Sequence, residues 1–438
     1  MQQTNTVVET EAQLPLEWRE RLSPSKLNTI PGRYNLPRMF RRHSTKQQMR
    51  ENTSPTTKSI ASLQTSFKVT DTIHLLRTRR WSVLDLQQVV LAAFTVFSVW
   101  IIEPSAPVIK TSVLLGYLLL LFMPATRQFF LPSWPIWTYL LYFFSSRFIP
   151  FDVRPDILVK VLPALEDILY GTNFSNTFSS WTHPVLDVIA WFPYGLGHFG
   201  LPAICSAIMF IFAAPGTVPM FAKSFGWMSV LGVTIQLLFP CTPPWYERLH
   251  GLEPARYGMQ GSPAGLARID ALFGVDMYTT SFTTAPVPFG AFPSLHAADA
   301  VLEALFMSYC FPRLRALCTF YVCWICWATM YLNHHYAVDL LGGGIIAYTI
   351  FWVVRRYWLP RPQAGKTYRW EYEYVEVGRT QKTKVVDEEV GYGLVPKRSV
   401  DYVNNEFTVL DSFMHSASSS GSSSPTSIRS DKSYRRDD

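Results

Sequence analysis

Long apolar segments alternate with polar loops through the middle of this chain, whereas both of its ends are polar. Several apolar runs approach the length of about 20 residues that crosses a bilayer as a helix. Examples are Val113–Met123, Leu196–Ala214, Ser229–Phe239 and Leu340–Val354. A helix satisfies all of its backbone polar groups internally, as lipid requires. The pattern therefore predicts an all-α fold, a polytopic transmembrane helical bundle.

The apolar segments predict about eight spans inside a membrane domain of residues 81–360. A further short segment, Val185–Phe192, is a candidate interfacial helix before the fourth span. A count of six spans would also leave both chain ends on one side, so parity leaves the number open. The predicted spans are Gln88–Ile102, Thr111–Ala125, Trp134–Ile149, His198–Ala213, Phe225–Phe239, Ala297–Phe311, Leu317–Leu332 and Val338–Trp358.

Basic residues follow every second predicted span and so suggest an orientation. If the N-terminus is cytosolic, the rule that positive charges remain in the cytosol is obeyed after spans two, four, six and eight. Both termini are then cytosolic, and the segments Phe151–His183, Pro240–Leu295 and Asn333–Ala337 face the lumen. The basic residues are Arg127, Lys223, Arg313, Arg315, Arg355, Arg356 and Arg361.

The two polar ends of the chain are predicted to be cytosolic tails. Residues 1–80 are basic and rich in Thr, Ser and Gln, which predicts a largely flexible extension without a secretory signal peptide. Residues 361–438 form the second tail. Its end, Ser416–Ser427, is too rich in Ser to bury a core.

Composition supports a membrane protein rather than a nucleic-acid-binding one. Only 16% of residues are charged, against roughly a quarter in soluble domains. The net charge of +7 comes from basic residues beside apolar spans, so no nucleic-acid partner is expected. Five of the six cysteines lie in apolar segments, where packing is the simplest role. No acidic cluster of metal-site character is visible, so we expect neither a metal nor another cofactor.

The first chemical motif is Gly290–His296, which ends at the start of an apolar helix. Ser294 is a plausible cap for that helix. The free N–H groups and the positive dipole end at a helix N-terminus favour an anion such as phosphate. His296 would stand beside that anion.

The second motif is Asn333–Asp339, at the start of the last span. His335 and Asp339 are four residues apart and share one helix face. A carboxylate bonded to one imidazole nitrogen fixes the tautomer and leaves the other nitrogen basic. An Asp inside an apolar span is costly and is usually paired and functional. The pair therefore indicates an activated histidine nucleophile.

Together these motifs resemble two signatures of the type 2 phosphatidic acid phosphatase superfamily. The wider context resembles the fungal inositol phosphorylceramide synthases, the targets of aureobasidin A, from about Pro150 to Tyr357. The stretches that carry this resemblance are Pro243–Tyr246, His250–Pro254, Gly261–Asp270, Gly290–His296 and Met330–Leu340.

The resemblance implies a catalytic core of six helices with His296, His335 and Asp339 as catalytic residues. It also implies transfer of phosphoinositol from phosphatidylinositol to ceramide, with release of diacylglycerol. Such enzymes work in the Golgi membrane with the site facing the lumen, and the resemblance suggests a small accessory membrane subunit as partner.

The chain departs from the phosphatase pattern at its phosphate-binding arginines. Thr329 stands where the phosphatases have an Arg, six residues before the second histidine. Arg147 and Arg154-Pro155 have the spacing of the remaining signature but lie two spans too early. Candidate substrate-binding residues are therefore Ser294, His334, Arg154, Arg256 and Arg268, with Arg248 as a further rival, and the phosphate-binding arginine stays open.

These residues predict a double displacement in which His335 attacks phosphorus and His296 acts as general acid and then base. The loop Pro240–Leu295 is either a lid that excludes water or a purely structural loop. A lipid phosphatase that uses water as acceptor is the nearest rival function. A transporter or scaffold that kept the fold without chemistry is a rival of another class.

Overall fold

A computed structural model describes residues 60–79, 83–102, 107–377 and 381–383 of the chain. Most of the predicted N-terminal extension and the Ser-rich segment Ser416–Ser427 lie outside these residues.

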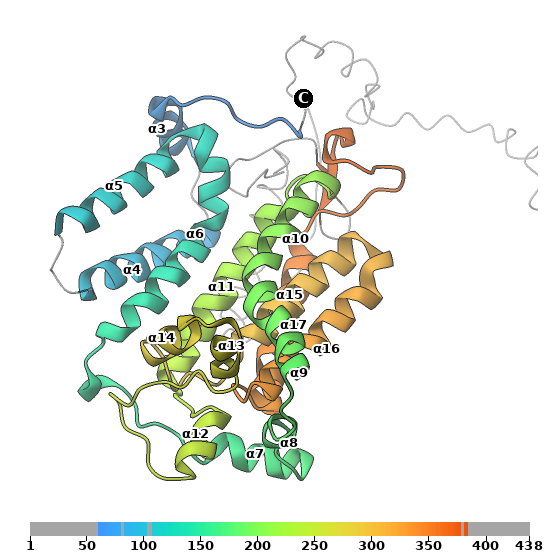
Figure 1. The fold of residues 1–438 in the computed structure, drawn as a ribbon. Coiled ribbons are helices and arrows are strands. Elements are labelled where there is room, and N and C mark those ends of the chain that lie inside the picture. The colour runs from blue at the N-terminus through green and yellow to red at the C-terminus, as the bar shows by residue number, and fades with distance from the viewer. Residues whose placement is uncertain (1–59, 80–82, 103–106, 378–380, 384–438) are drawn as a thin grey trace, which may run out of the picture. The chain divides into compact units, whose positions relative to one another are not determined.

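The described chain is mostly helical, which confirms the all-α class (Figure 1). Every one of the predicted apolar segments is helical. A small antiparallel pair, β1 (Val375–Val377) and β2 (Gln381–Thr383), follows the last helix. The helices are α3 (Val69–Thr78), α4 (Leu86–Ile101), α5 (Pro107–Phe122), α6 (Pro124–Ser145), α7 (Val161–Tyr170), α8 (Phe174–Ser179), α9 (Pro184–Trp191), α10 (His198–Phe212), α11 (Thr217–Leu238), α12 (Pro244–His250), α13 (Leu266–Phe273), α14 (Met277–Thr283), α15 (Leu295–Cys310), α16 (Arg315–Tyr331) and α17 (Ala337–Tyr357).

Four helical segments are long and apolar enough to cross a membrane, and a bent pair, Lys110–Phe122 with Pro124–Phe148, can supply a fifth. The predicted number of eight therefore stays a prediction. The helices α4 and α15 have 16 residues each, and α15 also carries Asp299 and Glu303. The four segments are Pro184–Phe212, Thr217–Leu238, Pro312–Tyr331 and Ala337–Tyr357.

The structure corrects the prediction of a separate interfacial helix at Val185–Phe192. Helices α9 and α10 are continuous through a π-helical turn, η6 (Phe192–Gly197). Pro193 has no N–H to donate to the carbonyl of Ile189, and this normally ends a helix. Here the indole N–H of Trp324 donates to that carbonyl at 3.1 Å. Since the carbonyl has a partner, the helix can run past the proline.

The core lies where α15 meets α10, α11, α16 and α17. Its buried side chains are large and apolar, and they include Met209, Met228, Leu302, Phe306 and Phe351. Helix α6 packs closely on α11 at Gly226, where an added Cβ would lie 2.4 Å from the backbone of Pro135 and Ile136.

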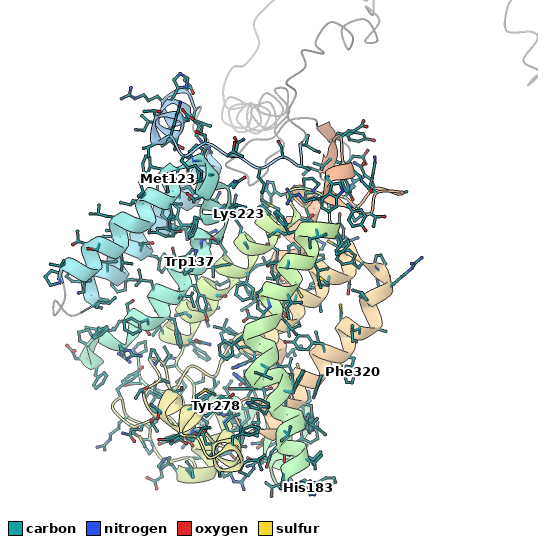
Figure 2. All side chains as sticks on the ribbon, turned by 45° about the horizontal axis from the view of Figure 1, so that its top comes forward. Met123, Trp137, His183, Lys223, Tyr278 and Phe320 are labelled. Carbon is teal, nitrogen blue, oxygen red and sulfur yellow. The ribbon has the colours of Figure 1, made fainter. Side chains whose placement is uncertain are left out.

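The bundle has two distinct ends. Figure 2 shows Met123 and Lys223 at one end and Tyr278 and His183 at the other. The short helices α7, α8, α12, α13 and α14 gather at the second end (Figure 1). Backbone bridges from Cys241 to Leu158 and Gly290 join the loops there. The predicted cytosolic Lys223 and the predicted lumenal segments are thus at opposite ends of the bundle.

The described parts of the two predicted tails pack together. Ile60, Tyr372 and Val375 form a buried cluster with Ala214, in the turn between α10 and α11. The predicted boundaries at residues 80 and 361 stay predictions, although some residues outside them contact the helical body.

Candidate active site

The turn that precedes α17 is fixed by Asn333. This residue has a φ of 61°, in the left-handed region that Asn tolerates better than most residues. Its side-chain amide donates to the hydroxyls of Ser175 and Ser179 at 3.2 Å each. Its carbonyl accepts the N–H of Trp245 at 3.1 Å. Contacts to α8 and α12 therefore set the path of the next two residues, His334 and His335.

Two buried carboxylates hold the first turn of α17. Asp339 accepts the N–H of Tyr336 at 3.1 Å. Glu166, on α7, accepts the N–H groups of Ala337 at 3.3 Å and Val338 at 3.1 Å. Burial raises the pKa of Glu166, although its bonds to backbone N–H groups oppose the shift. The sequence analysis missed Glu166, whose only local signal is an acid within an apolar helix.

Ser294 caps α15, as predicted from the sequence. Its hydroxyl accepts the N–H of Ala297 at 3.4 Å. Its backbone N–H donates to the carbonyl of Asp339 at 3.1 Å, so the first turns of α15 and α17 are joined. The side-chain amide of Gln236, on α11, holds the carbonyl of Pro293 at 3.0 Å. These bonds fix the start of the helix that carries His296.

The three predicted catalytic residues meet at this junction. Nδ1 of His296 lies 3.1 Å from Nε2 of His335, within hydrogen-bond distance. Nδ1 of His335 lies 3.2 Å from Oδ1 of Asp339, a close polar contact that lacks the direction of a hydrogen bond. Asp339 is fully buried and His335 is 7% exposed. The contacts form a series from Asp339 through His335 to His296.

Two aromatic rings that the sequence analysis missed contact His296. The rings of Tyr194 and His198 have their centroids 4.4 Å from that of His296, with interplanar angles of 23° and 38°. Nδ1 of His198 lies 3.6 Å from Oδ2 of Asp299, one turn along α15 from His296. The sequence signal for His198 was only a polar residue at the start of an apolar span.

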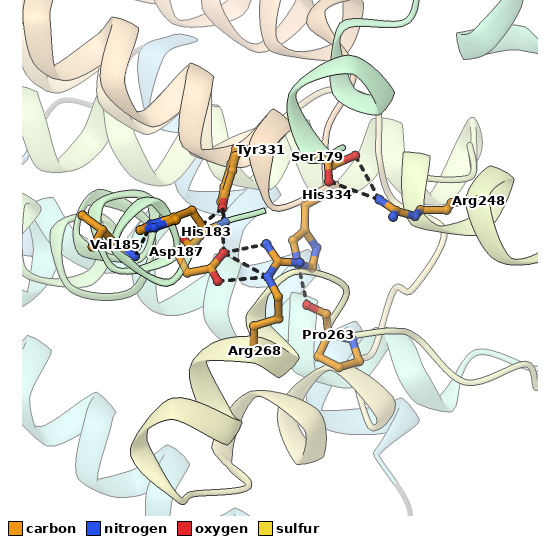
Figure 3. A network of polar contacts seen from close by, with 9 residues as sticks. All are labelled: Ser179, His183, Val185, Asp187, Arg248, Pro263, Arg268, Tyr331 and His334. Atoms are coloured by element: carbon orange, nitrogen blue, oxygen red, sulfur yellow. Dashed lines mark hydrogen bonds and ion pairs between the residues drawn. The ribbon is translucent and has the colours of Figure 1, made fainter. Parts of the chain in front are cut away.

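His334, a predicted substrate-binding residue, has its Nε2 atom 3.0 Å from the carbonyl oxygen of Pro263 (Figure 3). Burial, together with the neighbouring His335, lowers the pKa of His334 to about 3. The ring is therefore neutral near pH 7, and Nε2 can donate a proton to that carbonyl. This contact ties the turn before α17 to the loop Pro240–Leu295.

Arg268 pairs with a carboxylate of the protein (Figure 3). Its guanidinium donates through Nε and Nη2 to Asp187, on α9, at 2.9 and 2.7 Å. The hydroxyl of Tyr331 donates to the same carboxylate at 2.8 Å. Burial lowers the pKa of Arg268, but the bonds and charge of Asp187 outweigh it and the net shift is upward.

The other predicted arginines occupy different settings. Arg154 donates to the carbonyls of Ser146, Arg147 and Ile149, and burial lowers its pKa. It therefore fastens its own loop. Arg248 donates to Ser179, as Figure 3 also shows. Arg256 is exposed to solvent.

Comparisons with known proteins identify the family of this chain. The model of the PAP2 superfamily matches residues 167–353, a range that contains all three catalytic candidates. The inositol phosphorylceramide synthase catalytic subunit of Schizosaccharomyces pombe is 51% identical over 313 residues, which cover 72% of this chain and 74% of the relative. No solved structure matches the chain significantly.

Two further fungal relatives cover a similar share of the chain. The inositol phosphorylceramide synthase catalytic subunit of Saccharomyces cerevisiae is 42% identical over 72% of this chain and 79% of its own length. The inositol phosphorylceramide synthase of Candida albicans is 40% identical over 80% of this chain and 74% of its own length. The chain therefore belongs to the inositol phosphorylceramide synthases, within the PAP2 superfamily.

Proposed function

We propose that this chain transfers phosphoinositol from phosphatidylinositol to ceramide and releases diacylglycerol, through a phosphohistidine intermediate. The relatives are named for the product of this transfer. The observation that carries the proposal is the series of contacts from Asp339 through His335 to His296. A double displacement needs a carboxylate, a nucleophile and a proton donor in this order, and the series of contacts supports the proposal for that reason.

His335 is the proposed nucleophile because of the tautomer that Asp339 favours. A carboxylate 3.2 Å from Nδ1 of His335 stabilises the proton on that nitrogen. Nε2 of His335 then carries a lone pair, and it is this nitrogen that faces His296. Attack by Nε2 forms an N–P bond and breaks the bond between phosphorus and the diacylglycerol oxygen.

His296 is the proposed general acid and base. As an imidazolium it gives a proton to the departing diacylglycerol oxygen and becomes neutral. It then takes the proton from the primary hydroxyl of ceramide, whose oxygen attacks phosphorus and breaks the N–P bond. Proton transfers of this kind typically contribute about 10²–10⁴-fold each in rate.

The resting geometry implies that the phosphate separates the two histidines. Nε2 of His335 is engaged by His296 at 3.1 Å, a gap too short for a phosphoryl group. The substrate must therefore enter between the rings and replace this bond. The backbone N–H groups of Leu295 and His296 are in the first turn of α15, and the side chain of Ser294 caps neither of them, because it accepts the N–H of Ala297. Free N–H groups at a helix N-terminus suit a phosphoryl oxygen.

The proposed substrate-binding residues divide into three groups. Ser294 and His334 would act by holding the first turn of α15 and the turn before α17. Arg154 and Arg268 would act by fastening loops at the same end of the bundle. Arg256 is exposed, and its guanidinium makes no hydrogen bond or ion pair with another described residue. It is therefore the predicted arginine best able to reach the phosphoinositol headgroup.

We further propose a Golgi membrane location, cytosolic termini, a site that faces the lumen and a small accessory membrane subunit as partner. The proposed orientation is supported by Lys223, which lies at the end of the bundle opposite His183 (Figure 2). The basic Lys223, which is predicted to be cytosolic, and the predicted lumenal segment that ends at His183 thus lie at opposite ends of the bundle, as the positive-inside rule requires.

The proposal is tested with purified protein in liposomes that contain labelled phosphatidylinositol, with and without ceramide. We expect inositol phosphorylceramide and diacylglycerol only when ceramide is present. His335→Ala should reduce this transfer to background. Free inositol phosphate as the sole labelled product would instead identify a lipid phosphatase, and unchanged lipid turnover by His335→Ala would remove the proposed nucleophile.

A further inference from the structure

The π-helical turn between α9 and α10 lies where this long helix contacts the general acid. Tyr194 is inside the turn, and His198 follows it immediately. A π turn widens the helix by one residue, and such turns are frequent at functional sites. Here the two rings, four residues apart, both reach His296 with centroid distances of 4.4 Å.

Each of these two rings also lies close to a second side chain. Tyr194 is 4% exposed, and its ring also lies 5.4 Å from that of His334. His198 faces Asp299, with its Nδ1 atom 3.6 Å from Oδ2. Asp299 is 5% exposed, and its Oδ1 has no hydrogen-bond partner among the described residues. The proposed mechanism uses neither His198 nor Asp299.

We propose that Tyr194 and His198 form a ring clamp that positions His296, with Asp299 holding the ring of His198 in place. The clamp keeps Nδ1 of His296 directed at the reaction centre beside Nε2 of His335. This inference rests on the proposed role of His296 as general acid and base. It makes His198 a positioning residue, which acts through its flat ring and not by carrying a proton.

The catalytic cycle explains why such a clamp is needed. The bond between His296 and His335 orients both rings in the resting state, but the entering phosphate must break it. From then on, the contacts with Tyr194 and His198 must hold the ring of His296, because His335, its other ring neighbour among the described residues, would be on the far side of the phosphate. A displacement of 1 Å in a catalytic group can cost about 10²-fold in rate. The ring of Tyr194 is stacked on that of His296 with an interplanar angle of 23°, and stacked aromatic pairs attract each other.

The first experiment compares two substitutions of His198 in the full-length protein, with phosphatidylinositol and ceramide in liposomes. His198→Ala removes the ring, and we expect kcat about 10–100-fold lower with KM for both lipids within about twofold. His198→Phe keeps a flat ring without a titratable nitrogen, and we expect kcat within about threefold of the wild type. His74→Ala, on the exposed face of α3, is the matched histidine control.

The second experiment tests Asp299 through the same measurement. Asp299→Leu leaves His198 without its carboxylate, and we expect kcat about tenfold lower because the ring can turn away. In the double variant His198→Phe with Asp299→Leu, an apolar pair replaces the polar pair. Such replacements are often tolerated where removal of one partner is not. We therefore expect the double variant to be more active than Asp299→Leu alone.

Two results would overturn the clamp. One is a folded His198→Ala protein with wild-type kcat. The other is a His198→Phe protein as inactive as His198→Ala, which would mean that the imidazole carries a proton. Monodispersity and melting temperature in detergent confirm that each variant is folded. Failure of the proposed function is seen separately, since wild-type protein would then form no ceramide-dependent product.

Discussion

At the scale of single residues, Asp339 serves two neighbours at once. Its Oδ2 atom accepts the N–H of Tyr336, and its Oδ1 atom faces Nδ1 of His335. The first contact shapes the turn, and the second would set the tautomer of the proposed nucleophile. The same side chain therefore links the local fold to the chemistry, and a substitution that keeps its shape can separate the two roles.

We predict that Asp339→Asn lowers kcat by about 10²–10⁴-fold, the range seen when a histidine is held in the wrong tautomer. The amide oxygen can still accept the N–H of Tyr336. The amide nitrogen can donate to Nδ1 of His335, which moves the proton to Nε2 and blocks attack. Steady-state transfer at saturating lipid measures kcat. Asp276→Asn, at an exposed position near α14, is the control, and equal activity of both variants would contradict the assignment.

At the scale of elements, the site depends on how closely α15 and α17 approach. A Cβ added to Gly343 would lie 2.1 Å from the carbonyl oxygen of Ser294 and 3.2 Å from the N–H nitrogen of Ala298. Both contacts are with backbone, which cannot swing aside. The absence of a side chain at Gly343 therefore allows the N-terminal turn of α15 to sit against α17, where Ser294 meets Asp339.

We predict that Gly343→Ala destabilises the protein by about 1–3 kcal/mol, as overpacking of a core does, and strongly reduces transfer. The neighbouring Gly344→Ala is the control. Its Cβ would meet only a methyl group of Val301 at 3.7 Å, and Ala favours a helix over Gly. Thermal unfolding in detergent and transfer activity measure both effects. Equal melting temperatures and activities for the two variants would show that the helices are free to separate.

At the scale of the whole molecule, the loop Pro240–Leu295 is fastened to the bundle at several points. Arg268 bonds to Asp187 on α9, and Tyr331 on α16 bonds to the same carboxylate (Figure 3). The carbonyl of Pro263 contacts the ring of His334. These contacts connect α9, α13 and α16 around the histidines, so the loop is well placed to keep water from the proposed phosphoenzyme.

We predict that Arg268→Ala raises the ratio of free inositol phosphate to transferred product and lowers the melting temperature. Removal of the guanidinium leaves the carboxylate of Asp187, which is 4% exposed, without its charged partner. A loosened loop admits water, which competes with ceramide for the intermediate. Product ratios from labelled phosphatidylinositol measure the effect. Arg313→Ala, at an exposed position after α15, should leave the ratio unchanged. A melting temperature that falls without any change in ratio would identify a purely structural loop.

The sequence by itself determined the features that depend on short-range spacing. The apolar segments became helices, Ser294 became a cap, and His335 lies beside Asp339, four residues further along the chain. The prediction that both lie on one helix face was wrong, because α17 begins at Ala337 and His335 lies in the turn before it. Local periodicity also has limits. It predicted separate segments at Val185–Phe192 and His198–Ala213, where the structure has one helical segment, Pro184–Phe212. The indole that satisfies the carbonyl of Ile189 lies on a distant helix, which local periodicity cannot show.

Only the tertiary structure decided which distant groups meet. Glu166 reaches the first turn of α17 across 172 residues of sequence, and the ring of His198 reaches His296 from another helix. Arg268 could have faced a phosphate, but the structure gives it Asp187. A charged or aromatic side chain takes whichever partner the packing brings within reach. The spacing of residues along the chain does not predict which distant groups become partners.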